Sequence, residues 1–432
     1  MSEKSLKDRK LYLDKLIAFQ DTDLIKVITG IRRCGKSSLM KLMSARIKNM
    51  GIAAECVLEI NFESMNFAGM DDRKLYEYVI ERVVAGKKMY LFFDEIQFVR
   101  NWQRAINSFR VDLNCDIYIT GSNAYLLSSE LSTYLAGRYV EIKLYPLSFS
   151  EFIDFSEFRI KEKRLPDGKI RKQLLDTENE VVQTRDVFDS YVRFGGMPPI
   201  MDSYPDQEKV TAVLDGIYSA VVVRDILERV RREGSRAVTD ASLLRKLTMF
   251  LADNIGNNSS ANSISKTLIY ENLLTSKPGV PTVQAYMDAL VEAYIFYEIK
   301  RFDIKGRDYL RTLGKHYIVD IGIRNYLLGF RGGDSGHVLE NIVFFELLRR
   351  GYQVAVGKIN NLEIDFIATK TDEKMYIQVT ETMLEKQTRE RELTPLLMIK
   401  DNYKKMVITM DSPIFPDNEG IQIVNALEWL LA

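Results

Sequence analysis

The feature that most constrains this chain is an eight-residue loop with fixed glycine, lysine and serine positions. Residues 30–37 read GIRRCGKS and match the pattern GxxxxGK[ST] at all four fixed positions. An apolar, β-rich run at residues 24–29 precedes the loop, and a helical pattern with Leu39, Met43 and Ile47 follows it. Glycines let such a loop curl, so that successive N–H groups and the helix N-terminus face one phosphate. The sequence therefore predicts a phosphate-binding loop. The alternative is an ordinary glycine turn before a helix.

Individual positions of this loop have different expected tasks. Lys36 is expected to reach the β and γ phosphates of a nucleotide, and Ser37 is expected to ligate Mg²⁺. Arg32 and Arg33 either add phosphate contacts or stay solvated. The predicted nucleotide-binding residues are Gly30, Ile31, Arg32, Arg33, Cys34, Gly35, Lys36, Ser37 and Ser38.

Short apolar runs alternate with helical patterns through the first 150 residues. The runs lie at residues 24–29, 56–62, 89–94, 115–121 and 139–145. This alternation is typical of a parallel sheet that is covered by helices on both faces. The sequence thus predicts an α/β fold of the P-loop type, with the glycine loop directly after the first strand.

A second nucleotide signal lies at residues 91–95, which read LFFDE. An apolar strand that ends in two carboxylates places Asp94 at the C-terminal edge of the sheet, next to the phosphate loop. We expect Asp94 to hold the magnesium shell and Glu95 to act as the base for an attacking water. The alternative is an acidic turn or helix cap.

Two weaker candidates come from the fourth and fifth strands. Thr120, Gly121, Ser122 and Asn123 follow one another at the end of the fourth strand, and Asn123 or Ser122 is expected to orient water near the γ-phosphate. An Asn/Gly turn is the alternative. Arg138 precedes the fifth strand and is either a charge-stabilising arginine, in the same chain or across subunits, or a partner in a structural salt bridge.

The composition excludes several other kinds of chemistry. The 432 residues hold only two histidines and three widely spaced cysteines, which excludes a His-rich zinc site and a disulfide framework. Sixty Lys and Arg balance sixty Asp and Glu, so any contact with nucleic acid must come from a local patch. No apolar run approaches the length of about 18 residues that a membrane span needs. We expect a cytoplasmic protein.

These motifs occur together in a known group of proteins. GIRRCGKSSL, LFFDEIQ, ITGSNA and LAGRYVEIKLYPLSFSEF resemble successive motifs of the AAA-type P-loop ATPases of bacteria and archaea that carry a C-terminal domain of unknown function. FGGMPP, KHYIVDIGIRN, LENIVFFELLRRGY and EIDFIA extend the resemblance over nearly the whole chain. It implies nucleotide binding and ATP hydrolysis. It implies no particular substrate.

Two segments in the middle of the chain, residues 156–205 and 206–312, differ from the first part in their sequence pattern. Residues 156–205 are predicted to be a lid or linker, and residues 159–172 within them hold seven basic and two acidic residues. We interpret this basic stretch as an exposed linker or insertion, which is either solvated or in contact with a phosphate backbone.

Residues 206–312 predict a helical, winged-helix-like region with three short helices and a hairpin. The third helix has no Lys or Arg and contains Asp288 and Glu292, so it is poorly equipped for DNA. The hairpin after it is rich in Lys and Arg. The region is thus interpreted as a protein-docking module or, through its hairpin, as a nucleic-acid contact.

Residues 313–432 predict a small α/β domain. An apolar helix precedes two strands, which place Glu363 and Asp365 on one face and Gln378 and Thr380 on the neighbouring strand. This order resembles the PD-(D/E)XK nuclease core, in which acidic residues and a lysine bind magnesium and activate water. Gln378 replaces an expected acid and Thr380 the expected lysine, for which Lys386 is a candidate substitute.

Three interpretations of this last domain stay open: an active nuclease, a degenerate nuclease-like fold used for binding, and an unrelated α/β module. His316 and His337 are expected to be core or loop residues rather than metal ligands. The first part of the chain, residues 1–155, is the predicted AAA-type ATPase domain.

The predicted activity is Mg²⁺-dependent ATP hydrolysis that is coupled to a nucleic-acid or protein partner. The alternative is a nucleotide-dependent switch or scaffold with little turnover, in which the nuclease-like domain only binds. Neither prediction involves a membrane, and both are compatible with oligomerisation.

Overall fold

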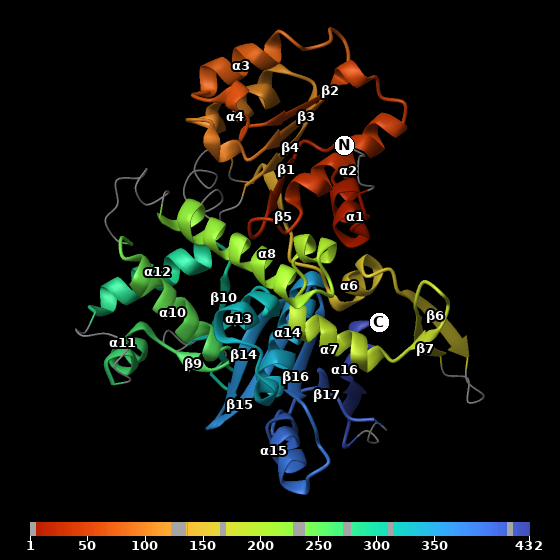
Figure 1. Cartoon of the computed structure of the whole chain (residues 1–432), viewed down its shortest axis with the longest axis vertical. Coiled ribbons are helices and arrows are strands. Elements are labelled where there is room, and N and C mark those ends of the chain that lie inside the picture. The colour runs from red at the N-terminus through yellow and green to blue at the C-terminus, as the bar shows by residue number, and fades with distance from the viewer. Residues whose placement is uncertain are drawn as a thin grey trace. The chain divides into compact units, whose positions relative to one another are not determined.

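The computed structural model describes residues 6–121, 135, 137–164, 170–227, 238–270, 278–306, 308–309, 314–412 and 418–432. The chain divides into two compact units (Figure 1). One consists of Met1–Tyr145 with Glu292–Tyr294, and the other of Pro146–Val291 with Ile295–Ala432. Each unit has its own sheet and its own core.

The first unit is built on a five-stranded parallel sheet. Its strands are β1 (Ile25–Thr29), β2 (Val57–Asn61), β3 (Met89–Asp94), β4 (Cys115–Thr120) and β5 (Tyr139–Lys143), in the spatial order β2-β3-β4-β1-β5. Every neighbouring pair is parallel, so the C-terminal ends of all five strands lie at one edge. The prediction of five strands in a parallel α/β sheet is confirmed.

Helices cover this sheet because successive strand residues point to opposite faces. α3 (Asp72–Ile80) and α4 (Trp102–Asp112) pack on one face, where they share a core with the apolar side chains of β3 and β4. α1 (Lys10–Ala18) and α2 (Lys36–Asn49) lie on the other side (Figure 1). All six residues of β3 are buried, as expected for a central strand that is covered on both faces.

The second unit contains a mixed sheet of seven strands. In spatial order these are β12 (Asp308–Tyr309), β11 (Arg301–Asp303), β14 (Gln353–Ile359), β15 (Leu362–Lys370), β16 (Glu373–Thr380), β17 (Lys404–Thr409) and β18 (Ile421–Asn425). The largely buried helix α14 (Ser335–Arg349) and helix α15 (Lys386–Leu397) pack against this sheet, and α16 (Ala426–Leu430) follows its last strand. The expected apolar helix and the expected hairpin, β15 with β16, are both present.

Three helices, α10 (Ala241–Asp253), α11 (Ala261–Tyr270) and α12 (Val280–Glu292), precede an antiparallel strand pair, as the sequence predicts. The pair is β10 (Phe296–Ile299) with β13 (Gly314–Ile318), and β9 (Asn258–Ser259) pairs with the other edge of β13. β11 is not part of this small sheet, because it pairs with β14 in the seven-stranded sheet. Strand pairing therefore crosses the predicted boundary between residues 312 and 313, and the winged-helix assignment stays a prediction.

The basic segment that we expected to be a linker or insertion forms regular structure. β6 (Arg159–Arg164) and β7 (Ile170–Leu175) pair antiparallel, and β8 (Val181–Val182) pairs with β7. α6 (Phe149–Phe155) precedes this hairpin, and α7 (Thr184–Phe194) follows it. Five of the six residues of β6 are charged, and the apolar residues of β7 do not alternate along the strand, so hydrophobic periodicity does not reveal this hairpin. Backbone pairing and the buried Leu174 stabilise it.

The second unit also contains α8 (Gln207–Ala220) and α13 (Ile321–Leu328). Among the residues that the structure describes, no helix combines the length and apolarity that crossing a membrane requires.

Candidate nucleotide-binding site

The loop between β1 and α2 has the curled backbone that its glycines predict. Gly30 has a φ of +141° and Gly35 a φ of +103°, which residues with side chains rarely adopt. A Cβ atom on Gly30 would lie 2.1 Å from the carbonyl oxygen of Leu144, so a side chain has no room there. α2 begins directly after Gly35, and its first turn offers N–H groups without helical partners. This local geometry is that of an anion site at a helix N-terminus.

The lysine of the loop is folded back onto the loop itself. Lys36 is only 4% exposed, and its Nζ donates hydrogen bonds to the carbonyl oxygens of Gly30 at 3.0 Å and Ile31 at 3.1 Å. Both acceptors are neutral, and a phosphate oxygen is a stronger partner for an ammonium group than a carbonyl oxygen. The ammonium group of Lys36 is thus held against the loop by two backbone carbonyl groups.

The other loop residues differ in exposure. Arg32 forms an ion pair with Glu63 at 3.1 Å, whereas Arg33 is exposed and has a φ of +65°. Ser37 is half-buried in the first turn of α2, and Ser38 is exposed. Ser37 is therefore the better protected of the two hydroxyls.

The thiol of the loop cysteine is not reactive. Cys34 is completely buried, and burial raises the pKa of its thiol, which keeps the sulfur protonated. Its carbonyl oxygen accepts a hydrogen bond from Arg9 at 3.0 Å. Cys34 thus contributes backbone and packing rather than reactivity.

Asp94 ends β3 at the same sheet edge as the loop. β4 pairs in parallel with both β1 and β3, so the ends of these three strands lie side by side. The Asp94 carboxylate accepts hydrogen bonds from Thr120 Oγ1 at 2.6 Å and from Asn61 Nδ2 at 3.0 Å, one on each oxygen. A carboxylate has about four lone-pair positions, so Asp94 is oriented and still able to bind a cation.

Glu95, directly after β3, is held in an unusual conformation. Its φ is +56°, in the left-handed region, and its side chain is buried. A non-glycine residue in this region costs about 1 kcal/mol, which the surroundings must offset. The N–H of Glu95 donates to Thr120 Oγ1 at 2.9 Å, and the Gln97 side-chain amide donates to its carboxylate. The structure therefore fixes both the backbone and the carboxylate of Glu95.

Sequence reasoning missed the specific roles of Thr120 and Asn61. Thr120 ends β4, Asn61 ends β2, and both strands neighbour β3 in the sheet. The signal that could have found them is that each is a polar residue at the end of an apolar run. Their partners depend on the strand order, which the sequence does not state.

The two weaker candidates fare differently. Asn123, like Ser122, lies outside the described residues. Arg138 lies at the opposite edge of the sheet, because its carbonyl oxygen accepts the N–H of Ile25, at the start of β1. The five residues of β1 separate that edge from the loop by about 16 Å, and Arg138 NH1 donates to Asn107 at 3.0 Å. The structure thus separates Arg138 from the phosphate loop of its own chain.

The donor chemistry of Ser37 and Asp94 fits Mg²⁺. Magnesium takes oxygen ligands, retains several waters and accepts others from substrate phosphates. One hydroxyl and one carboxylate at the end of a phosphate loop are therefore a sufficient contribution from the protein.

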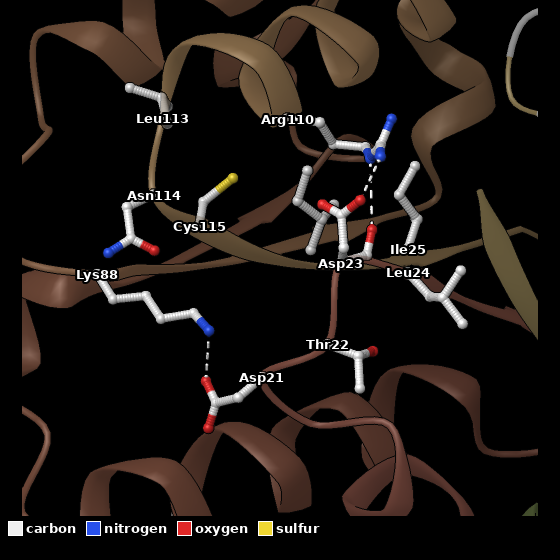
Figure 2. Close-up of a pocket in the computed structure, with 11 residues that line it drawn as sticks. Asp21, Thr22, Asp23, Leu24, Ile25, Lys88, Arg110, Leu113, Asn114 and Cys115 are labelled. Carbon is white, nitrogen blue, oxygen red and sulfur yellow. Dashed lines mark hydrogen bonds and ion pairs between the residues drawn. The ribbon is translucent and has the colours of Figure 1, made fainter.

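A separate pocket of about 210 Å³ opens at the other edge of this sheet (Figure 2). Its charged side chains are already paired, Lys88 with Asp21 at 2.8 Å and Arg110 with Asp23 at 2.8 Å. Burial raises the pKa of the Cys115 thiol in this pocket to about 11. The pocket therefore offers neither a free cation for phosphate nor a reactive thiolate.

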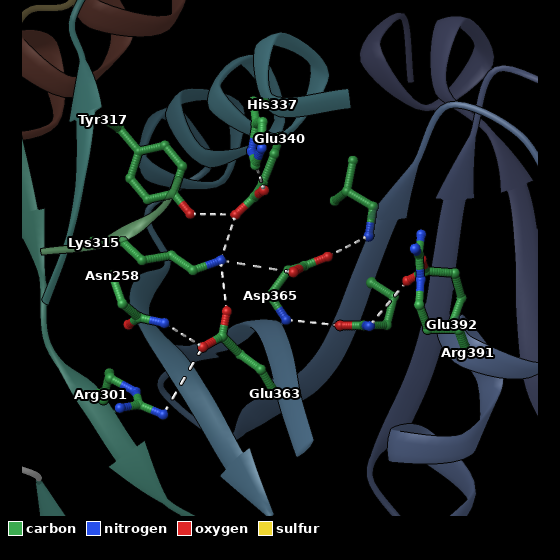
Figure 3. Close-up of polar contacts among 12 residues, drawn as sticks. Asn258, Arg301, Lys315, Tyr317, His337, Glu340, Glu363, Asp365, Arg391 and Glu392 are labelled. Atoms are coloured by element: carbon green, nitrogen blue, oxygen red, sulfur yellow. Dashed lines mark hydrogen bonds and ion pairs between the residues drawn. The ribbon is translucent and has the colours of Figure 1, made fainter. Parts of the chain in front are cut away.

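A buried lysine lies among three carboxylates in the second unit (Figure 3). Lys315 on β13 is 3% exposed, and its Nζ lies 2.9 Å from Glu340 of α14. It also lies 2.9 Å from Glu363 and 3.8 Å from Asp365, both on β15. Burial by itself lowers the pKa of Lys315, but the carboxylates outweigh burial and raise that pKa above its usual value.

One ammonium group does not neutralise three carboxylates. Glu340 also accepts a hydrogen bond from the Tyr317 hydroxyl at 2.5 Å, and Glu363 accepts one from Asn258 at 2.8 Å. Burial, followed by the charge of Glu340, raises the pKa of Asp365 well above its usual range. Asp365 is thus the member of the cluster whose charged form is most disfavoured by its surroundings.

The two positions that depart from the nuclease pattern have internal partners. Gln378 accepts the N–H of Asp365 at 2.7 Å and donates to Glu392 at 3.1 Å, and the Thr380 hydroxyl donates to the carbonyl oxygen of Thr382 at 3.2 Å. Lys386 is 89% exposed and lies 3.8 Å from Glu390, away from the cluster. Lys315, from an earlier strand, supplies the ammonium group instead.

The histidines lie in different surroundings. His316 is buried, contacts Ser259 Oγ through Nδ1 at 3.0 Å and has its pKa lowered to about 4 by burial, so it is a neutral core residue. His337 is half-exposed and lies 3.7 Å from Glu340.

Comparisons with known proteins match an AAA domain in the first unit and give no known function for the second unit. Residues 22–153 match a family described as an AAA domain, and residues 185–334 match a domain of unknown function, DUF8612. Among solved structures, Orc1 of Aeropyrum pernix in complex with DNA gives a TM-score of 0.31 at 14% identity, over 74% of this chain and 92% of that one. Cdc6p of Pyrobaculum aerophilum also gives 0.31, at 12% identity over 79% and 96% of the two chains.

Two relatives match over most of their length. An uncharacterized protein of Methanocaldococcus jannaschii is 29% identical over 424 residues, which is 94% of this chain and 88% of the relative. An uncharacterized protein of Haemophilus influenzae is 40% identical over 430 residues, which is 99% of each chain. The chain therefore belongs to the same family as the Haemophilus influenzae protein, with an AAA domain in its N-terminal part.

Proposed function

We propose that this protein binds ATP with Mg²⁺ at the loop of residues 30–37 and hydrolyses it. The observation that carries the proposal is the gathering of that loop, Asp94 and Glu95 at one edge of a parallel sheet. The AAA domain match over residues 22–153 supports nucleotide binding independently.

Each group at this edge has a chemical task that its surroundings suit. The loop N–H groups and Lys36 bind phosphate oxygens, and Ser37 with Asp94 holds the metal ion. Mg²⁺ supplies charge neutralisation for the phosphates when it is bound. Glu95 accepts a proton from the attacking water, and the Gln97 amide together with Thr120 keeps its carboxylate and backbone in position.

The test is phosphate release by the purified full-length chain with Mg-ATP. Lys36→Ala is expected to abolish ATP binding, and Glu95→Gln to bind ATP without turning it over. Lys41→Ala is a matched control, because Lys41 is exposed on the same helix. Turnover that survives both Lys36→Ala and Glu95→Gln would contradict the proposal.

A nucleotide-dependent switch is the second form that this function can take. ATP binding that requires Lys36, without phosphate release under any condition, would favour the switch. Addition of DNA or RNA to the turnover assay tests the proposed coupling to a nucleic-acid partner. We retain Asn123 as a candidate for orienting water, and Arg138 as a candidate for completing the site of a neighbouring subunit.

For the C-terminal domain, residues 313–432, we propose that it serves for binding and does not cleave nucleic acid. The Lys315 ammonium already bridges Glu340 and Glu363, and Gln378 is a poor ligand for Mg²⁺. Purified protein with Mg²⁺ is therefore expected to leave DNA and RNA intact. Cleavage that Asp365→Ala abolishes would show an active nuclease instead.

A further inference from the structure

The hairpin of β6 and β7 separates its charges by face. Residues opposite each other across the two strands share a face, and each face recurs every two residues. The positions of one face are the cross-strand pairs Arg159 with Leu175, Lys161 with Gln173, and Lys163 with Arg171. We call these positions the basic face, since they carry four cations and no acid.

The opposite face attaches the hairpin to the second unit. Here Ile160 pairs with Leu174, and Glu162 pairs with Lys172. Leu174 is completely buried, and Lys172 Nζ donates a hydrogen bond to the carbonyl oxygen of Leu431. Glu162, the one acidic residue of the two strands, lies on this face but is exposed, as is Ile160, so the hairpin is attached through β7. The pleat of the strands therefore turns the basic face away from the body of the unit, at whose periphery the hairpin lies (Figure 1).

Two cations of the basic face, Arg159 and Lys161, have described side chains. Arg159 and Lys161 are exposed, and within the described ranges no ion pair involves either of them. The backbone register places Lys163 opposite Arg171, so four of the six sequence positions of this face are basic.

We propose that the basic face binds the phosphate backbone of double-stranded DNA without reading its sequence. Two-residue steps along a strand are about 6.6 Å, which matches two phosphate steps of about 3.4 Å along the axis of one DNA strand. A two-stranded ribbon also fits the major groove of B-DNA, whereas the major groove of duplex RNA is too narrow and deep.

Other polyanions fit this face less well. Single-stranded nucleic acid is bound through aromatic stacking, and β6 and β7 contain no aromatic residue. A lipid surface requires several apolar side chains beside the cations, whereas the six positions of the basic face hold one, the half-buried Leu175. The chain is neutral overall, so attraction to DNA must be local to such a patch. This inference makes DNA the partner of the proposed ATPase, and the DNA contact itself requires no ATP turnover.

The experiment measures binding of the full-length chain to a fluorescent duplex of about 30 base pairs and mixed sequence, without nucleotide, by anisotropy between about 50 and 200 mM salt. The ribbon variant combines Arg159→Gln with Lys161→Gln. The matched control combines Lys400→Gln with Lys404→Gln, which removes two exposed charges elsewhere in the same unit. The charge-retaining pair Arg159→Lys with Lys161→Arg tests for rescue, and thermal unfolding verifies that each variant is folded.

For the wild type we expect an affinity that falls steeply with salt. The ribbon variant should reduce the slope of log K against log salt by about 1.8, at about 0.9 per lost contact, and weaken binding at least about tenfold near 100 mM salt. The control and the charge-retaining pair should keep the wild-type slope.

Several outcomes would overturn the proposal. The first is absence of duplex binding at the lowest salt, and the second is an equal loss of affinity in the Lys400 and Lys404 control. The third is binding to a single strand, to duplex RNA or to phosphatidylserine vesicles that is tighter than binding to duplex DNA and is lost in the ribbon variant. Failure of ATP hydrolysis alone would leave this result untouched, because the assay contains no nucleotide.

Discussion

Thr120 Oγ1 donates a hydrogen bond of 2.6 Å to Asp94 Oδ1 and accepts the N–H of Glu95 at 2.9 Å. One fully buried hydroxyl on β4 thereby fixes both acidic residues that follow one another at the end of β3. A hydroxyl can donate one hydrogen bond and accept others, so no apolar side chain of similar shape replaces it.

Thr120→Val is therefore expected to lower kcat for ATP hydrolysis about 10- to 100-fold, which is the usual cost of removing a group that orients a metal ligand. ATP binding through the loop should change little, since Thr120 contacts no loop residue in the described hydrogen bonds. Steady-state phosphate release with a Mg²⁺ titration measures the effect. Thr120→Ser retains the hydroxyl and should recover most of the activity. Full activity of the valine variant would remove Thr120 from the site.

A buried arginine connects the phosphate loop to the chain's N-terminal segment. Arg9 NH1 donates to the carbonyl oxygens of Cys34 at 3.0 Å and Tyr145 at 2.9 Å, and its guanidinium lies 4.6 Å from the centre of the Tyr12 ring. Arg9→Met keeps most of the volume but removes the donors from two carbonyl groups. We expect a loss of about 2 kcal/mol in the free energy of unfolding and a KM for ATP raised about tenfold.

Urea unfolding and ATP titration of the Arg9 variant measure these two effects. Arg9→Lys, which retains the charge but not the two-donor geometry, should fall between the wild type and the methionine variant. An unchanged KM together with reduced stability would restrict Arg9 to a structural role.

The parts of the molecule that the sequence predicts well are those with local signals. The three central strands of the first unit, β1, β3 and β4, are apolar because they are buried, and the loop and the Asp94–Glu95 pair are contiguous motifs. Arg138 shows what such a local signal leaves open. A residue that precedes a strand lies at the opposite edge of a parallel sheet from residues that follow strands.

The remaining features depend on contacts between distant segments. Asn61 and Thr120 reach Asp94 only because β2 and β4 neighbour β3. Lys315 meets Glu340 and Asp365 through the packing of three separate elements, and no spacing rule predicts such a meeting. The β6–β7 hairpin is not predicted for another reason, because five of the six residues of β6 are charged and give no alternating apolar pattern.

Asp320 gives the second unit a specific pH dependence. Its carboxylate caps α13 by accepting the N–H of Ile323 at 3.1 Å, and it also accepts the N–H of Gly196 at 2.7 Å. Burial raises its pKa to about 6, although these hydrogen bonds favour the charged form. In the unfolded chain an aspartate has a pKa of about 3.9.

Because the pKa is higher in the folded state, the folded protein binds the proton more tightly. The contribution of Asp320 to stability is fully present below about pH 4 and is lost as the pH rises to about 6. A difference of about two pKa units corresponds to about 3 kcal/mol. Urea unfolding of wild type and Asp320→Asn between these pH values measures it. The difference in unfolding free energy between the two proteins should vary by about that amount, and a constant difference would contradict the shifted pKa.

The Lys315 cluster makes opposite predictions for two of its members. Lys315→Met leaves Glu340 and Glu363 without their shared ammonium partner in a buried site, and breaking a buried ion pair in this way costs about 3 to 5 kcal/mol. Asp365→Asn should cost less than about 1 kcal/mol, because burial and the charge of Glu340 already raise the pKa of this carboxyl group and disfavour its charged form, and an amide oxygen can still accept the N–H of Val379. Urea unfolding at pH 7 compares the two variants directly. If Asp365→Asn proved as destabilising as Lys315→Met, Asp365 would be a charged partner of the lysine. The cluster would then hold three full negative charges around Lys315, with the guanidinium group of Arg301 3.9 Å from Glu363.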